Sequence, residues 1–175
     1  MMMLVVTGFS QQIFNVKVDT KPDGPYDESL GSIKITGEVL NGQKNGTWTE
    51  YHPNMELPHY IIQYKDGKKD GLYIEIDRQA YIVKKAEYKN DLLDGAVYEW
   101  FRGGRLSKKQ DYKEGKLDGK TAVYYDNGFL QEESEYKEGN KNGVTTWYVY
   151  SNKEQGGKIA MYTYVDGKFE GVQEI

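Results

Sequence analysis

The sequence lacks cysteine and has little histidine or proline. Its 175 residues contain no cysteine, two histidines and four prolines. The absence of cysteine excludes disulfides, thiolate metal sites, a thiol nucleophile and the lipidated cysteine of a lipoprotein anchor. It leaves the redox compartment of the protein open.

Long apolar runs and a charge excess are also missing. Apolar residues make up 38% of the chain, against about 45 to 50% in typical globular domains, and no run approaches the roughly 18 apolar residues of a membrane-spanning helix. The 23 basic and 27 acidic residues are mixed along the chain and give a net charge of -4. We therefore expect no transmembrane segment and no binding to nucleic acid.

The first residues resemble part of a signal peptide. Residues 1–9 are mostly apolar, and the small and polar residues Gly8, Ser10 and Gln11 are typical of a cleavage site. The basic stretch that normally precedes such a core is absent, and an apolar first strand is the other interpretation. We interpret residues 1–11 as the remnant of a signal peptide, which predicts an exported, periplasmic or cell-surface protein; a cytoplasmic location is the alternative.

Glycine and tyrosine are abundant, with 20 and 16 residues, and they recur at fixed spacing. A unit of the form Tyr, then Gly-x-x-x-Gly, returns every 24 residues, with one interval of 28 that is explained by the longer turn "SNKEQGG". Such a period is typical of a repeat protein built from stacked supersecondary units. The opening tyrosines are Tyr64, Tyr88, Tyr112, Tyr136 and Tyr164; the second glycines are Gly46, Gly71, Gly95, Gly119, Gly143 and Gly171; the first glycines are Gly42, Gly67, Gly115, Gly139 and Gly167, with Asp91 in one unit.

Each unit predicts two antiparallel strands. A run rich in rings and β-branched residues, such as "KTAVYY", is followed by a turn such as "DNG", a returning run such as "FLQEESEYK" and a second turn. Both glycines of the motif are assigned to turns, where glycine adopts a positive φ at little cost. The turn at 126–128 is read as holding two or three residues. The sequence therefore predicts an all-β protein, an elongated antiparallel meander of repeated hairpins with little or no helix.

Alternation along the strands assigns side chains to two faces of the sheet. The first, third and fifth residues after the second glycine form the more apolar set, as in Leu72, Ile74 and Ile76, and their face is predicted to be packed. The other face is mixed and is predicted to be wet and decorated with rings. Its residues Tyr73, Phe101, Tyr125 and Trp147 are the candidate partner-binding surface.

Residues 12–36 are interpreted as N-terminal strands, a loop and a partial first unit. The run "IFNVKVD" predicts a strand, "TKPDGPYDESLG" a loop and the best candidate for a flexible joint, and "SIKITGEV" the returning strand of the partial unit. Residues 37–175 are predicted to form an array of about five to six units.

The units "YKDGKKDGLYIEI", "YKNDLLDGAVYEW" and "YKEGNKNGVTTWYVY" closely resemble the MORN-repeat variant found in bacteria, and the resemblance covers residues 37–171. Proteins of this variant are often labelled antitoxins of the YwqK type in toxin–antitoxin systems. The resemblance implies an antiparallel ribbon of β-hairpins, and links elsewhere in the family to lipids, dimerisation and protein partners. It carries over the opening tyrosines, the paired glycines and a ring five residues after the second glycine. Those rings are Tyr51, Trp100, Tyr124 and Tyr148; the second unit departs, with Ile76 there and "DRQA" at its turn.

No residue pattern predicts catalysis. His52 and His59, with Glu50 and Glu56 nearby, lack any recognised spacing of zinc ligands and are interpreted as surface histidines. Neighbouring carboxylates in a strand point to opposite faces and cannot converge. No glycine and lysine pattern has the spacing of a phosphate-binding loop. We therefore predict no catalytic residues, no metal site and no cofactor.

Two functions are open at this level. The first is a non-enzymatic scaffold that binds a protein partner, antitoxin-like, through its ringed face or an edge strand. The second is an exported surface protein that binds carbohydrate or lipid by stacking on its aromatic rows. A structural interpretation of the rings, as cross-strand pairs that stabilise a thin sheet, is compatible with both.

Overall fold

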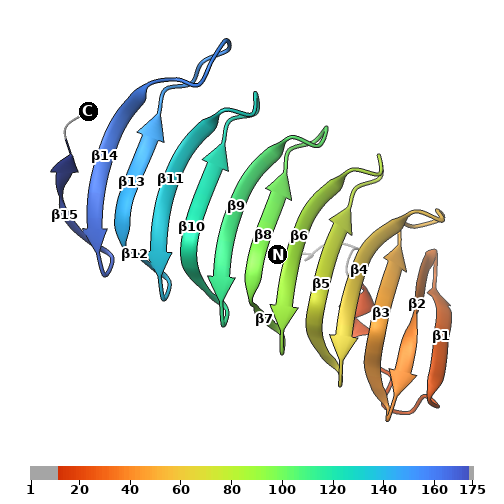
Figure 1. Ribbon diagram of the computed structural model, residues 1–175. Coiled ribbons are helices and arrows are strands. Elements are labelled where there is room, and N and C mark those ends of the chain that lie inside the picture. The colour runs from red at the N-terminus through yellow and green to blue at the C-terminus, as the bar shows by residue number, and fades with distance from the viewer. Residues whose placement is uncertain (1–11, 174–175) are drawn as a thin grey trace, which may run out of the picture.

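The computed structural model describes residues 12–173, and these form one curved antiparallel β-sheet (Figure 1). The predicted fold class is confirmed. The strands follow one another across the sheet in chain order, with the two short strands β7 and β12 set beside β6 and β11. The expectation of a signal-peptide remnant at residues 1–11 lies outside the described residues.

One short helix precedes the strands. The helix is α1 (Gln12–Asn15). The strands are β1 (Gly24–Leu30), β2 (Ile33–Leu40), β3 (Gln43–Tyr51), β4 (Pro58–Lys65), β5 (Lys68–Ile76), β6 (Ile82–Lys89), β7 (Leu92–Leu93), β8 (Gly95–Trp100), β9 (Leu106–Lys113), β10 (Lys116–Tyr124), β11 (Leu130–Lys137), β12 (Asn140–Lys141), β13 (Gly143–Tyr148), β14 (Lys158–Val165) and β15 (Lys168–Gln173).

The turns at one end of the hairpins explain the first glycine of the motif. Each of these turns has two central residues at positive φ, as in Glu114 (50°) and Gly115 (81°). Two positive φ values define the tight hairpin turn whose twist matches the strands. Asn90 (50°) and Asp91 (70°) build the same turn without glycine, because Asn and Asp tolerate this region better than most residues.

The second glycine lies inside a strand, so its assignment to a turn is wrong. Gly119 (φ 118°) sits in β10 where the pairing with β9 shifts between Leu117 and Thr121. It faces Tyr136 of the next strand. A positive φ within a strand is the signature of a β-bulge, and glycine is the residue that adopts it most readily. The repeat thus fixes one turn and one bulge per hairpin; Gly171, which lacks a positive φ, departs from this rule.

Three of the turns at the other end, at 78–80, 102–104 and 126–128, hold three residues, which resolves the ambiguity at 126–128. Tyr125 N–H donates to Phe129 O at 2.8 Å, and Gly128 N–H donates to Tyr125 O at 2.9 Å. The "DRQA" turn makes the equivalent bonds, Asp77 N–H to Tyr81 O and Ala80 N–H to Asp77 O. The second hairpin is therefore regular despite its sequence.

Replacing Ala80 with glycine is expected to raise the free energy of unfolding by about 1 kcal/mol, because alanine there holds a left-handed backbone. The φ of Ala80 is 65°, where the related turns have glycine. Urea unfolding of Ala80→Gly measures the gain. Gln79→Gly, in the same turn but at negative φ, is the control and should give no gain; an equal gain from both would contradict the explanation.

The N-terminal part differs from prediction in two places. The run at 13–19 is not a strand: α1 and the residues after it pack on the sheet instead of pairing with it. The stretch at 20–31 is not a loop throughout, because β1 lies within it and pairs with β2 over its whole length. Pro25 is tolerated there since β1 has no neighbour on its other side among the described strands. The predicted strand at 32–39 is confirmed as β2.

The buried face is the opposite of the predicted one. Tyr73, Val97, Thr121 and Thr145, each the second residue after the motif glycine, are buried. Of the residues that follow them, Ile74, Tyr98 and Ala122 are partly exposed and Thr146 is buried. We call the buried side the inner face. Three rows of side chains cross it from strand to strand. The central row is Trp48, Ile62, Tyr73, Ala86, Val97, Gln110, Thr121, Ser134, Thr145 and Tyr162.

The two outer rows cover the central one. The row near the tight turns alternates the motif tyrosines with Lys44, Lys69, Leu93, Leu117, Lys141 and Phe169. The row on the other side is rich in charge and includes Glu50, Glu75, Lys84, Glu99, Lys108 and Glu132. Long side chains on both sides keep water from the small residues between them, so even Thr145 is 1% exposed.

The buried hydrophobic core is confined to residues 13–97 of the described chain. Every buried hydrophobic side chain falls between Ile13 and Val97. From Thr121 onward the buried side chains of the described residues are Thr and Ser. The inner face therefore carries an apolar core over the first repeats, where we call it closed, and only small buried polar side chains over the last, where we call it open.

Candidate functional site

Residues 12–18, the docked segment, cover the inner face of the first repeats. α1 lies against β3 (Figure 1). Ile13 and Val18 are buried in the core, and the Phe14 ring meets the Tyr60 ring edge-on with centroids 5.9 Å apart. Apolar burial at about 25 cal/mol per Å² is the main force that holds such a segment.

Two buried charged side chains form hydrogen bonds with the backbone of one residue in this segment. Ile13 N–H donates to Glu50 Oε2 at 2.7 Å, and Lys44 Nζ donates to Ile13 O. Glu50 is 1% exposed and Lys44 is 7% exposed. The Lys44 ammonium also lies over the rings of Trp48 and Tyr64, 5.3 and 5.2 Å from their centroids. Burial lowers the pKa of Lys44 to about 8.

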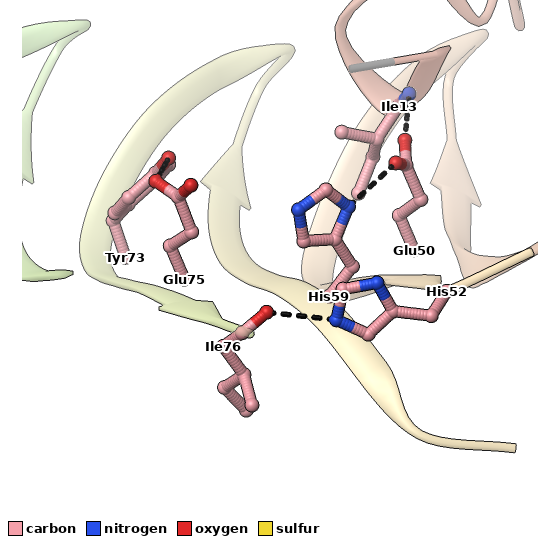
Figure 2. Close-up of polar contacts among 7 residues, drawn as sticks. All are labelled: Ile13, Glu50, His52, His59, Tyr73, Glu75 and Ile76. Atoms are coloured by element: carbon pink, nitrogen blue, oxygen red, sulfur yellow. Dashed lines mark hydrogen bonds and ion pairs between the residues drawn. The ribbon is translucent and has the colours of Figure 1, made fainter. Parts of the chain in front are cut away.

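The two histidines are part of the same cluster, so their prediction as surface residues is wrong. Figure 2 shows His59 beside Glu50, with Nδ1 3.4 Å from Oε1, and His52 bonded to the Ile76 carbonyl through Nε2 at 2.8 Å. The two imidazoles stack with centroids 4.3 Å apart. Because His52 is buried, its neutral form is favoured: burial lowers the pKa of His52.

Stability is expected to fall as the pH drops below about 6.5, the pKa of an unfolded histidine. The folded protein holds His52 at a lower pKa, so the unfolded chain binds more protons between the two values. The contribution of His52 is complete above the unfolded pKa and is lost toward the folded one. Urea unfolding at pH 7.5, 6.5 and 5.5 measures the loss. His52→Gln, which keeps a donor for Ile76 O but does not titrate, should lose less; an equal loss would contradict this role.

A groove of about 520 Å³ runs beside the docked segment. Phe14, Val16 and Val18 form one side, and Lys44, Tyr64 and Lys69 contribute to the other. Lys69 Nζ lies 4.2 Å from the Tyr88 ring centroid and 5.6 Å from that of Phe14. The lining of the groove is mixed, since the apolar side chains of the docked segment lie beside lysines and beside Asp19 and Asp91.

The last repeats present a different surface on the inner face. Trp147, Tyr162, Tyr164 and Phe169 form the ring cluster, with centroid separations of 5.3 Å for Trp147 to Tyr162 and 5.7 Å for Tyr162 to Phe169. Trp147 Nε1–H donates to Glu132 Oε2 at 3.1 Å, and Lys141 Nζ donates to the other oxygen at 3.0 Å. Phe169 is 56% exposed and Val172, paired with Tyr162, is 65% exposed.

The structure does not bring the four predicted partner-binding residues together. Tyr73 is buried between Tyr60 and Tyr88, and Trp147 belongs to the ring cluster several strands away. Phe101 and Tyr125 directly precede the three-residue turns at 102–104 and 126–128. Tyr125 donates its hydroxyl proton to Tyr148 O at 2.7 Å, and its ring packs on Tyr150. Of the four, Trp147 is the residue within the open part of the inner face.

The rings carried over from the family pattern lie on the face opposite the inner one. The Trp100 ring stacks on that of Tyr98 at 5.9 Å, and the Tyr148 hydroxyl donates to Glu133. Tyr51 lies under Lys34 Nζ, 5.5 Å from its centroid. The Trp100 contact lies within β8, whereas the contacts of Tyr148 and Tyr51 link neighbouring strands, which suits a structural role.

Sequence reasoning missed Lys44, Glu50 and Ile13 as a functional group. One signal was present: the fourth residue after the motif glycine is glutamate in three successive units, Glu50, Glu75 and Glu99. Glu75 and Glu99 are half-exposed, and Glu99 pairs with lysines of its own row at 3.6 Å. Glu50 differs because the docked segment and His59 contact it, and no local sequence pattern indicates the contact with Ile13.

Within residues 12–173, no group of three or more His, Cys, Asp or Glu side chains is placed to hold a metal ion. The one helix among these residues, α1, has four residues, too few to cross a membrane. No protein-family model and no curated protein matches the sequence.

Proposed function

We propose that this chain is a non-enzymatic repeat scaffold of the bacterial MORN-variant type that binds a protein partner, as an antitoxin of the YwqK type would. The observation that carries the proposal is the open ring cluster, with Phe169 and Val172 more than half exposed on the inner face. Exposed apolar patches beside polar groups mark sites of protein interaction. The 24-residue hairpin period supports the family assignment.

The ring cluster has the composition of a binding surface. Aromatic side chains are enriched at the centres of protein interfaces, where they bury large areas. Beside the cluster, Lys141 and Glu132 form an ion pair. A partner that covers these two side chains would therefore not bury an unpaired charge. A protein surface with complementary apolar side chains suits this site.

Affinity capture tests the proposal with three baits. The first is the unaltered chain, the second carries Phe169→Ser and Val172→Ser, and the control carries Leu30→Ser and Leu40→Ser, which are exposed apolar residues of β1 and β2. One dominant protein is expected with the first and third baits and is lost with the second. Equal capture by all three would place binding elsewhere, and a catalytic turnover lost on one substitution would contradict a non-enzymatic role.

Carbohydrate or lipid binding is the alternative, because ring faces also stack on sugars. In the described structure the rings of the cluster meet one another edge-on or tilted, which leaves fewer free faces than isolated rings have. Enrichment of a glycan or lipid, without protein, by the unaltered and control baits would replace the proposed function with this one.

A further inference from the structure

The docked segment is bound in the manner of a peptide ligand. Glu50 and Lys44 hold the N–H and C=O of the same residue, Ile13. Among residues 12–173 no carboxylate pairs with Lys44. Burying a charge is costly unless it is paired or hydrogen-bonded, and here the hydrogen-bond partner is the backbone of a segment outside the sheet.

We propose that the inner face over β3, β4 and β5 is a peptide-binding site, which the chain's own residues 12–18 occupy and which takes an apolar segment of a protein partner in their place. This inference rests on the proposed function, since it assigns the site of one partner contact. The partner segment has an aliphatic residue followed by an aromatic one, matching Ile13 and Phe14.

The contacts of the docked segment define that preference. Ile13 is fully buried, so the first position requires an aliphatic side chain that fits a closed space. Phe14 lies edge-on to Tyr60 and beneath Lys69 Nζ, which favours a ring at the second position. Recognition of the Ile13 backbone by Glu50 and Lys44 is independent of side-chain identity and suits a site that takes different sequences.

Exchange requires that the docked segment leave while the sheet stays folded. The hydrogen bonds between this segment and the sheet, in the part of the chain that the structure describes, are the two made by Ile13. No strand pairing joins residues 12–18 to the sheet. Segments with few backbone bonds open at lower free energy than paired strands. The groove of about 520 Å³ gives an incoming chain room to enter beside the resident one.

A labelled heptapeptide with the sequence of residues 12–18, QIFNVKV, tests the site on the full chain. Fluorescence anisotropy is measured with the unaltered protein and with an emptied variant carrying Ile13→Ser and Phe14→Ser. Because the resident segment competes with the peptide, we expect one-to-one binding to the emptied variant that is at least about tenfold tighter than to the unaltered protein. Adding Lys44→Met to the emptied variant, or replacing the peptide phenylalanine with serine, should weaken binding at least tenfold.

Absence of peptide binding by an emptied variant with an intact β-sheet circular dichroism spectrum overturns the inference. If the emptied variant does not fold, Phe14→Ala replaces it and should still bind more tightly than the unaltered chain; equal binding overturns the inference. If the unaltered protein is a dimer and the emptied variant is a monomer, two copies exchange this segment. The occupant of the site is then a second copy of the chain and not a protein partner. The peptide test uses purified protein and is independent of the capture experiment. If the peptide does not bind but the protein partner is still captured, this inference fails and the proposed function stands.

Discussion

Replacing Gly37 with alanine is expected to lower the free energy of unfolding by about 3 kcal/mol, the upper end of the usual cost of overpacking a core. A Cβ at Gly37 would lie 2.2 Å from Cδ2 and 2.3 Å from Cε2 of Trp48. The indole has nowhere to move, since it is fully buried and its Nε1–H is shared between Glu38 O and Asn45 O, each at 3.1 Å. Urea unfolding of the variant measures the loss.

Gly157→Ala is the matched control for this prediction. Gly157, like Gly37, has no positive φ, and nothing lies within 4 Å of a Cβ built there. The control should change stability by less than about 0.5 kcal/mol, as surface substitutions usually do. Similar losses in the two variants would show that the cost is that of losing glycine in general, and that Trp48 does not rest on β2 as described.

The second large effect is a difference between two neighbouring residues. Tyr73→Ala is expected to cost about 4 kcal/mol, as for a buried aromatic side chain, and Ile74→Ala about 1 kcal/mol, as for a half-exposed aliphatic one. Tyr73 packs between Tyr60 and Tyr88, with centroids 6.1 and 5.8 Å away, and Ile74 points to the other face.

Chemical denaturation of the two variants under the same conditions decides which face is packed. The free energy of unfolding of Tyr73→Ala is expected to be well below that of Ile74→Ala. The reverse order would restore the face that the apolar pattern favours and would contradict the inner face defined by Trp48 and Val97.

The architecture was predictable because its signals are local. A tight turn needs two residues at positive φ, and glycine, asparagine and aspartate supply them at a fixed place in each unit, as at Asn90 and Asp91. The positions of the turns then determine where the strands between them begin and end. The β-bulge at Gly119 was predicted as a turn because both structures use a glycine at positive φ. The residues around Gly119 do not distinguish a bulge from a turn.

The packed face was not predictable from apolar character alone. Leu72, Ile74 and Ile76 are more apolar than the residues between them, yet the inner face buries small and polar side chains such as Thr121 and Ser134. Their burial comes from the tyrosines and long charged side chains of the flanking rows. The alternation of apolar and polar residues reflects the hydrophobicity of each side chain. It does not report how far neighbouring side chains shield that residue from solvent.

The docked segment shows a similar limit. Ile13, Phe14, Val16 and Val18 carry the apolar character of a strand, but β1 already pairs with the edge of β2. The segment instead packs on the face of the sheet, where Ile13 and Val18 are buried and Phe14 and Val16 are partly buried. A contact between Ile13 and Glu50, 37 residues apart, has no local signature. The candidate site depends on this contact and was therefore found in the structure.

Hydrogen exchange, resolved by residue, tests whether the inner face is closed over the first repeats and open over the last. Strands β2 to β5 bury the core, whereas β13 to β15 lie beyond Val97. Because amides over a buried core open rarely, the account predicts exchange at least about tenfold slower in β2 to β5 than in β13 to β15, with the Ile13 amide protected by Glu50. Uniform protection along the sheet, together with a rapidly exchanging Ile13 amide, would contradict it.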